Sequence, residues 1–146
     1  MYALSQGARL EVVQFLVNKG ADVKATTKFG KTTLMSMDAS AENLDLAKFL
    51  ISKGADPKAK TKDGHTAVWY SKCNYEIFKF WKSQGLNLSE SDKNGRTTID
   101  QCLPLYYPQG LKGLKYLIGQ GVPLPQNWKA YSAYTDDIEK TIGRKK

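Results

Sequence analysis

Few side chains in this sequence have the type and spacing that catalysis needs. The only histidine, His65, stands in the polar segment KDGHTAV, where we expect it to be solvated. A histidine base needs an orienting partner inside a pocket, and the neighbouring residues supply none. Asp136 and Asp137 are adjacent carboxylates. Adjacent residues on a helix do not face each other, so acidic charge at a helix start explains this pair better. We therefore expect that the protein is not an enzyme.

The cysteines and glycines also give no sign of a metal or a bound cofactor. Cys73 and Cys102 lack the spacing of a metal site. The glycines follow a repeat rather than a strand-to-helix motif, so no phosphate loop or dinucleotide-binding fingerprint is present. The two cysteines could be free buried thiols or one disulfide bond, which leaves the redox compartment open. We expect no metal and no cofactor.

Composition and charge indicate a folded, basic domain. The chain has 146 residues, of which 41% are apolar and 11% aromatic, enough to build the core of one domain. Lysine and arginine number 22 against 14 aspartates and glutamates, which gives a net charge of +8. A surface this basic favours an acidic partner or a polyanion, and charge alone does not choose between them.

The sequence predicts no membrane span and no intact secretory signal. No run of about 18 or more apolar residues is present. The first residues, MYALSQGARLEVVQFL, lack both a basic leader and a continuous apolar stretch. Any export signal would therefore already have been removed.

The predicted helices and turns that would position a binding site recur along the sequence at a nearly regular interval. Gly20, Gly54, Gly85 and Gly121 each follow an apolar segment with helical spacing, at intervals of 34, 31 and 36 residues. We expect each glycine to end a helix in the left-handed conformation. A second glycine stands ten residues after each of the first three, in FGKTTL, DGHTAV and NGRTTI.

This second glycine marks a polar turn, and the threonine two residues later can begin the next helix. These threonines are Thr32, Thr66 and Thr97. One unit is thus a turn, a first helix, a short connection, a second more apolar helix and a glycine stop. Neither helix can bury its apolar face alone, so neighbouring units must stack into a small helical solenoid.

The segments GADVKATTKFGKTTL, GADPKAKTKDGHTAV and GLNLSESDKNGRTTI resemble the ankyrin repeat, over about residues 3–125. The resemblance implies an all-α solenoid of stacked helix-turn-helix units with β-hairpin-like finger turns. We expect a single domain over 1–146, with repeats at about 1–26, 27–60, 61–91 and 92–125, a C-terminal cap at 126–142 and a frayed tail at 143–146. The first repeat is truncated, which fits a natural half-repeat cap, a removed signal or a lost upstream segment.

The sequence departs from the family pattern in ways that affect packing. The usual histidine after the threonine is absent from every unit, so we expect its turn-bracing hydrogen bonds to be missing. The segment LPLYYP lengthens the connection of the last full unit. Cys73 and Cys102 fall in the first helices of adjacent units, whose axes lie about 8–10 Å apart, and we expect free thiols.

Two surfaces are candidates for binding. Basic residues recur at two positions of all three turn tips, and we call them the basic stripe; Phe29 adds an exposed aromatic at the first tip. The concave face of the first helices is the second candidate, although its aromatic residues also suit the core, and both roles stay open for Trp69. The stripe comprises Lys28, Lys31, Lys62, His65, Lys93 and Arg96, and the concave set comprises Met35, Trp69, Tyr70, Asp100, Tyr106 and Tyr107.

The resemblance implies a module that binds another protein, which we expect to have an acidic surface, through the finger tips and the concave face. A narrower version is an exported bacterial inhibitor or immunity protein that restrains an enzyme. The competing class is a polyanion or nucleic-acid binder, for which no RNA-binding motif or stacking platform is present. We expect a chain that is monomeric alone. The family default is the cytoplasm, with the bacterial periplasm as the alternative if a signal has been removed.

Overall fold

The structure is a computed structural model that describes residues 10–37, 43–103, 108–131 and 135–143. Helices and turns make up these residues, and no helix within them is long and apolar enough to cross a membrane. The longer helices are α2 (Leu10–Asn18), α3 (Leu44–Ser52), α4 (Tyr75–Ser83), α5 (Thr98–Cys102), α6 (Pro108–Gly119) and α7 (Thr135–Gly143). The short 3-10 helices are η1 (Leu34–Ser36), η3 (Trp69–Ser71) and η4 (Trp128–Tyr131).

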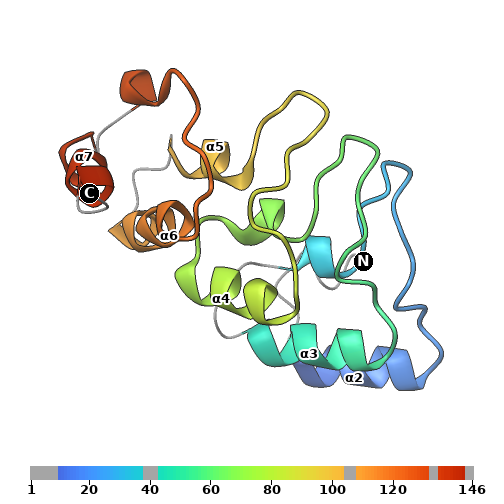
Figure 1. Cartoon of the computed structure of the whole chain (residues 1–146). Coiled ribbons are helices and arrows are strands. Elements are labelled where there is room, and N and C mark those ends of the chain that lie inside the picture. The colour runs from blue at the N-terminus through green and yellow to red at the C-terminus, as the bar shows by residue number, and fades with distance from the viewer. Residues whose placement is uncertain (1–9, 38–42, 104–107, 132–134, 144–146) are drawn as a thin grey trace.

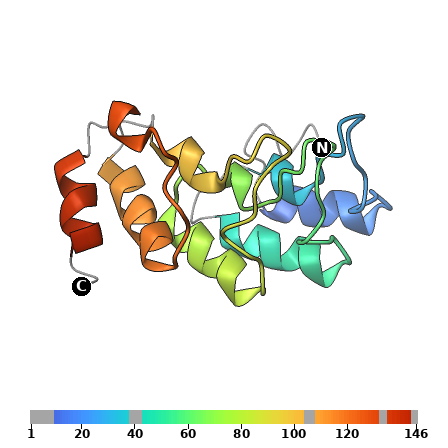
Figure 2. The same cartoon turned by 45° about the horizontal axis from the view of Figure 1, so that its top comes forward.

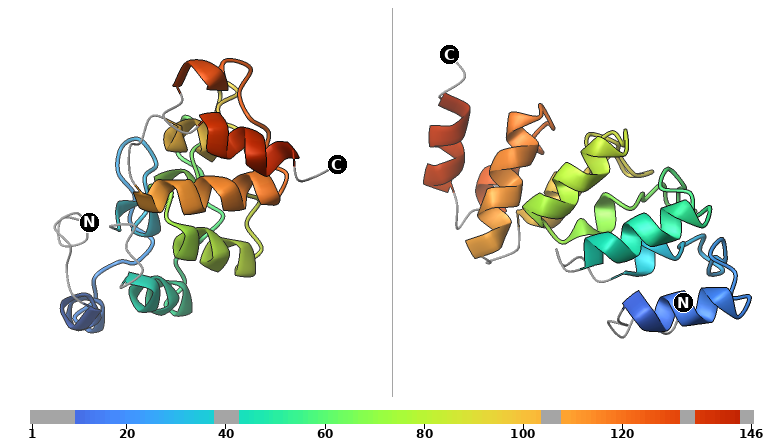
Figure 3. Two further views of the ribbon diagram at one scale, coloured as in Figure 1. Left: turned by 90° about the vertical axis from the view of Figure 1, so that its left-hand side faces the viewer. Right: turned by 90° about the horizontal axis from the view of Figure 1, so that it is seen from below.

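The second helices of the units, α2, α3, α4 and α6, lie side by side in one row (Figure 1 and the right view of Figure 3). The turns between units project together from one side of this row, and α7 packs on α6 at its C-terminal end (Figure 2). The prediction of an all-α solenoid with hairpin-like turns is confirmed.

The helix stops lie where the glycine pattern predicts them. At the end of α3, Gly54 has a φ of +94°, its N–H donates to Ile51, and the N–H of Ala55 donates to Leu50. This pair of bonds is a Schellman motif, which satisfies carbonyls that the helix leaves free. The same two bonds recur at the ends of α2, α4 and α6. Each second helix is therefore turned toward the next unit in the same way.

The first helices are shorter than the sequence suggests. η1 and η3 are single 3-10 turns of three residues, and α5 has five residues. The predicted threonine start is confirmed at Thr97, whose hydroxyl accepts from the N–H of Ile99. Asp100 completes a capping box by accepting from the N–H of Thr97 at 2.8 Å. Asp100 thus helps to begin α5.

Neighbouring units are also joined by buried threonine hydroxyls. Thr33 donates to the carbonyl of Val23 at 2.8 Å, and Thr98 donates to the carbonyl of Val68 at 3.0 Å. Both bonds tie the start of a first helix to the preceding unit. A buried carbonyl left without a donor is costly, so these hydroxyls stabilise the stack.

The expectation of free thiols is wrong: Cys73 and Cys102 form a disulfide bond, with their Cα atoms 5.4 Å apart. The expectation placed both cysteines inside regular first helices. Instead η3 ends after Ser71, and Lys72 and Cys73 adopt left-handed φ values of +45° and +58°. This turn takes Cys73 out of the helix and leaves its Cα within the Cα–Cα range of a disulfide bond to Cys102.

Gly113 brings α6 into close contact with the turn that holds Cys73. A Cβ atom on Gly113 would overlap the carbonyl oxygen of Cys73 and would lie 3.2 Å from the ring of Phe78. No side chain fits at this point, so a glycine is required where α6 crosses the turn.

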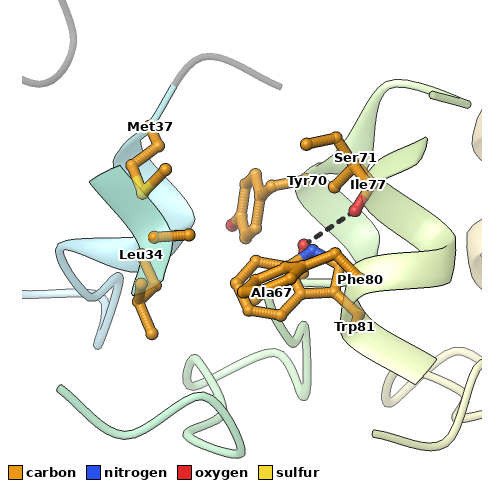
Figure 4. A pocket seen from close by; sticks show the side chains of 9 residues that line it. Leu34, Met37, Ala67, Tyr70, Ser71, Ile77, Phe80 and Trp81 are labelled. Atoms are coloured by element: carbon orange, nitrogen blue, oxygen red, sulfur yellow. Dashed lines mark hydrogen bonds between the residues drawn. The ribbon is translucent and has the colours of Figure 1, made fainter. Parts of the chain in front are cut away.

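The contact between two successive units is visible in Figure 4. Side chains of η3 and α4 face Leu34, Met37 and Ala47 of the preceding unit across a cavity of about 20 Å³. On the α4 side the cavity is lined by Ile77, Phe80 and Trp81. One face of α4 therefore packs backward, against the unit before it.

Candidate protein-binding surface

Three hairpin-like fingers, 27–31, 61–65 and 92–96, stand side by side within the described residues. In each finger the first residue donates its N–H to the carbonyl of the fifth. The side-chain oxygen of that first residue also accepts from the N–H of the fifth residue. The first residues are Thr27, Thr61 and Asp92.

This bond braces the turn in place of the absent family histidine. The expectation that the turns would lack bracing hydrogen bonds considered only the position of the family histidine. An oxygen-bearing side chain three residues before each tip glycine was the signal that could have shown the alternative.

The fingers are also bonded to one another. The N–H of Lys62 donates to the carbonyl of Phe29, and the N–H of Lys93 donates to the carbonyl of Asp63, each at 3.0 Å. A Cβ on Gly64 would lie 3.3 Å from the Cα of Asp92, so the glycine allows this close approach. The spacing of side chains from one finger to the next is therefore set by backbone contacts.

Across the bases of the three fingers, three aromatic rings lie in a row between two cationic side chains. Nζ of Lys31 lies 4.6 Å from the ring centre of Tyr70, whose ring meets His65 edge-on at 6.1 Å. His65 stacks on Trp69 with ring centres 4.1 Å apart, and Cζ of Arg96 lies 5.3 Å from the Trp69 ring centre. We call Lys31, Tyr70, His65, Trp69 and Arg96 the cation–aromatic row.

His65 is not solvated as the sequence suggested, because its side chain is only 14% exposed. Its Nε2 lies 3.3 Å from Oδ2 of Asp92 in the next finger, and its ring lies flat on Trp69. Asp92 is 27 residues away in the sequence, so the polar segment around His65 gave no sign of that contact. Trp69 is only four residues after His65, but its place in the first helix did not indicate that it would stack on the histidine. The histidine is a structural link between two fingers.

Asp92 holds two members of the row. Its carboxylate is fully buried and accepts from Nη2 of Arg96 at 2.7 Å and from Nε at 3.0 Å. Burial raises the pKa of this carboxyl, but hydrogen bonds from Arg96, Asn94 and His65 outweigh it and hold the pKa well below its usual range. Asp92 is therefore charged at neutral pH and fixes both His65 and Arg96.

Tyr70 contributes a neutral ring to the row. Burial, and secondarily the negative charge of Asp63, raise the pKa of its phenol. The ring thus stays uncharged at physiological pH, and its face attracts the ammonium group of Lys31.

A carboxylate beside a histidine also occurs in catalytic sites, but this pair has a different setting. Among the described residues, the hydrogen bonds of His65 run to Asp92 and to Thr61 of its own finger. A nucleophile within reach of the ring, as in a catalytic triad, is not among these contacts. The part of the chain that the structure describes also brings no three potential metal ligands together.

The finger tips carry the remaining residues of the basic stripe. Lys28, Lys62 and Lys93 are exposed, and Nζ of Lys28 lies 5.0 Å from the ring centre of the exposed Phe29. The structure thus joins the two predicted surfaces: the tips lead directly into the cation–aromatic row, which contains two residues of the concave set.

Other residues of the concave set have different environments. Met35 is 2% exposed and packs in the core, so the candidate surface does not include it. Asp100 is half-buried and engaged in the cap of α5. Tyr106 and Tyr107 lie outside the described residues.

Comparison with known families agrees with this architecture. A family model described as ankyrin repeats, in three copies, matches residues 1–92. The chain belongs to the ankyrin repeat family. The matched ankyrin segment includes the first two fingers and extends to Asp92 at the start of the third. No curated protein matches the sequence. Ankyrin repeats are in general protein–protein interaction modules and are typically not enzymes.

Proposed function

We propose that this ankyrin chain is a non-enzymatic module that binds an acidic segment of a partner protein on its fingers. The cation–aromatic row is the observation that carries the proposal. It sets flat aromatic surface between two positive charges over three neighbouring fingers. Tyrosine, tryptophan and arginine are the residues most often responsible for binding energy at protein interfaces.

The surrounding charge supports an acidic partner. Lys28, Lys62 and Lys93 extend the positive surface from the row to the tips, and the whole chain carries a net charge of +8. Such a surface speeds the encounter with a negative partner and disfavours basic ones. Asp92, the acidic residue beside the row, is buried and already paired with Arg96.

A charge-reversal experiment tests this surface. The wild-type chain is used as bait in affinity capture from its source organism, and captured proteins are identified by mass spectrometry. The same capture is repeated with Lys28→Glu, Lys62→Glu and Lys93→Glu combined. The matched control reverses three exposed lysines on the helices, Lys48, Lys82 and Lys140, which makes the same change in net charge.

We expect the finger variant to lose the partner and the helix variant to retain it, with unchanged helical circular dichroism in both. Equal capture by the two variants would remove the fingers from the interface. If the captured material is nucleic acid, and binding falls steeply with salt in both variants, the polyanion alternative replaces the proposal.

The disulfide favours one narrower role, that of an exported inhibitor or immunity protein. Disulfide bonds persist in oxidising compartments such as the bacterial periplasm and are rare in the cytosol. The bond between Cys73 and Cys102 is therefore expected in an exported chain. Trapping of free thiols in intact cells tests this: labelled cysteines in the native protein would contradict export, and an enzyme among the captured proteins would support inhibition.

A further inference from the structure

One end of the cation–aromatic row is carried by two very short elements of neighbouring units. η3 supplies Trp69 and Tyr70, and α5 begins just after Arg96, whose Cζ lies 5.3 Å from the Trp69 ring centre. η3 has three residues and α5 has five. Elements this short have few internal hydrogen bonds, so their relative orientation depends on what joins them.

Two bonds join η3 to α5, one near the start of each element and one near the end. Near the start, Oγ1 of Thr98 donates to the buried carbonyl of Val68 at 3.0 Å. Near the end, the disulfide bond joins Cys73, two residues after η3, to Cys102, the last residue of α5. One bond would leave either element able to turn about it, whereas two separated bonds fix the orientation.

The site of the disulfide bond is closely packed. Cys73 is 2% exposed and Cys102 1%, and α6 packs against the carbonyl of Cys73 at Gly113. Two thiol groups need more room than the bonded pair, and a close-packed interior resists added volume. Reduction would therefore displace one of the elements around the site.

The turn after η3 is the part that would move. Lys72 and Cys73 have left-handed φ values of +45° and +58°. This conformation is unfavourable for residues other than glycine, and it persists only where the surroundings enforce it. Without the disulfide bond both residues would relax out of it, and the end of η3 would follow. Because Trp69 belongs to the same single turn, its ring would shift relative to Arg96.

We propose that the disulfide bond positions Trp69 against Arg96, so that the protein binds its acidic partner only in the oxidised form. This inference rests on the proposed function of the cation–aromatic row. Bond formation takes two electrons and two protons from the thiols of Cys73 and Cys102, and a disulfide of the surroundings accepts them and becomes two thiols. Where the cysteines stay reduced, the row is incomplete and the partner is not bound.

Nuclear magnetic resonance of the full chain tests the positioning without a partner. Proton–nitrogen correlation spectra compare the oxidised wild type with the combined variant Cys73→Ser, Cys102→Ser. We expect the indole N–H signal of Trp69 and the amide signal of Arg96 to shift in the variant. The amide signal of Gly30 in the first finger should stay in place, because that finger is not attached to the disulfide bond.

Two further variants separate positioning from a general loss of stability. Ile138→Ala removes a fully buried side chain from α7 and keeps the disulfide bond. It should lower the stability and leave the signals of Trp69 and Arg96 unchanged. Adding Lys72→Gly to the double cysteine variant should move both signals back toward their wild-type positions, because glycine holds the left-handed conformation without help from the bond.

Affinity capture then measures binding by the same chains. We expect the double cysteine variant to capture at least about tenfold less partner than the oxidised wild type, and Ile138→Ala to capture as much. Equal capture by the cysteine variant, or unchanged signals of Trp69 and Arg96, would overturn the proposal. So would a cysteine variant that circular dichroism shows to be unfolded, because the bond would then serve the whole fold. An oxidised wild type that captures no partner would contradict the proposed function instead, and the spectra would still decide the positioning.

Discussion

Nε2 of His65 lies 3.3 Å from Oδ2 of Asp92, although 27 residues separate them in the sequence. The same carboxylate oxygen accepts from Arg96 at 2.7 Å. One buried charge thus joins the second finger to the third and holds the His65 ring and the Arg96 guanidinium beside the Trp69 ring. The geometry of the candidate binding surface depends on a residue that does not itself face the partner.

Asp92→Asn should lower the free energy of unfolding by about 1–3 kcal/mol, because the amide cannot replace the charged acceptor of Arg96. The wild-type stability should also depend on acid. The folded pKa of Asp92 lies below its usual value, so its contribution is complete above the unfolded pKa of about 3.9 and is lost as pH falls through the folded pKa. Urea unfolding at neutral pH and at acidic pH measures both effects.

Asp45→Asn is the control for Asp92, because Asp45 forms an exposed ion pair with Lys48. Its removal should change stability by less than about 0.5 kcal/mol. An Asp92→Asn chain with wild-type stability at neutral pH and the same acid dependence would show that the carboxylate does not hold the fingers together.

Gly113→Ala should destabilise the chain by at least about 2 kcal/mol, because the new methyl group overlaps the carbonyl oxygen of Cys73 and must displace α6 or the turn. Gly119→Ala in the same helix has no atom within 4 Å of its new Cβ. That control should be neutral or stabilising by up to about 0.5 kcal/mol. Thermal unfolding of the two variants compares them directly, and equal melting temperatures would refute the close contact.

Loss of the disulfide should lower the free energy of unfolding by about 3–4 kcal/mol, the entropy expected for closing a loop of this length. The double variant Cys73→Ser, Cys102→Ser removes the bond without leaving a reactive thiol. Denaturant unfolding with and without reductant provides the comparison: reductant should destabilise the wild type and leave the variant unchanged. If reductant does not change the free energy of unfolding of the wild-type chain, the bond does not form in solution.

Much of the architecture could be predicted from the sequence because glycine positions carry conformational information. Gly20, Gly54 and Gly85 end helices, and Gly30 and Gly64 turn fingers, all with positive φ as expected. The family and the solenoid follow from this repeated pair of landmarks. The backbone conformation of one turn or one helix end depends on residues that are close in the sequence, so the sequence alone predicts it.

The site was less predictable because its contacts join different units. The bond of His65 to Asp92 and the contact of Arg96 with Trp69 depend on how neighbouring fingers approach each other. Met35 was assigned to the concave face, yet the single-turn η1 buries it. The disulfide was missed because two successive left-handed residues that are not glycine, Lys72 and Cys73, leave no local signal in the sequence.

The link between Cys73 and Cys102 also sets how far the molecule can be stretched. A repeat protein pulled from its two ends lengthens as successive units peel away from the stack. The bond joins residues separated by 29 positions in the sequence. While it is intact, about 100 Å of extended chain between them cannot be pulled out. Under tension, the third and fourth units would therefore remain tethered after the first two had been drawn out.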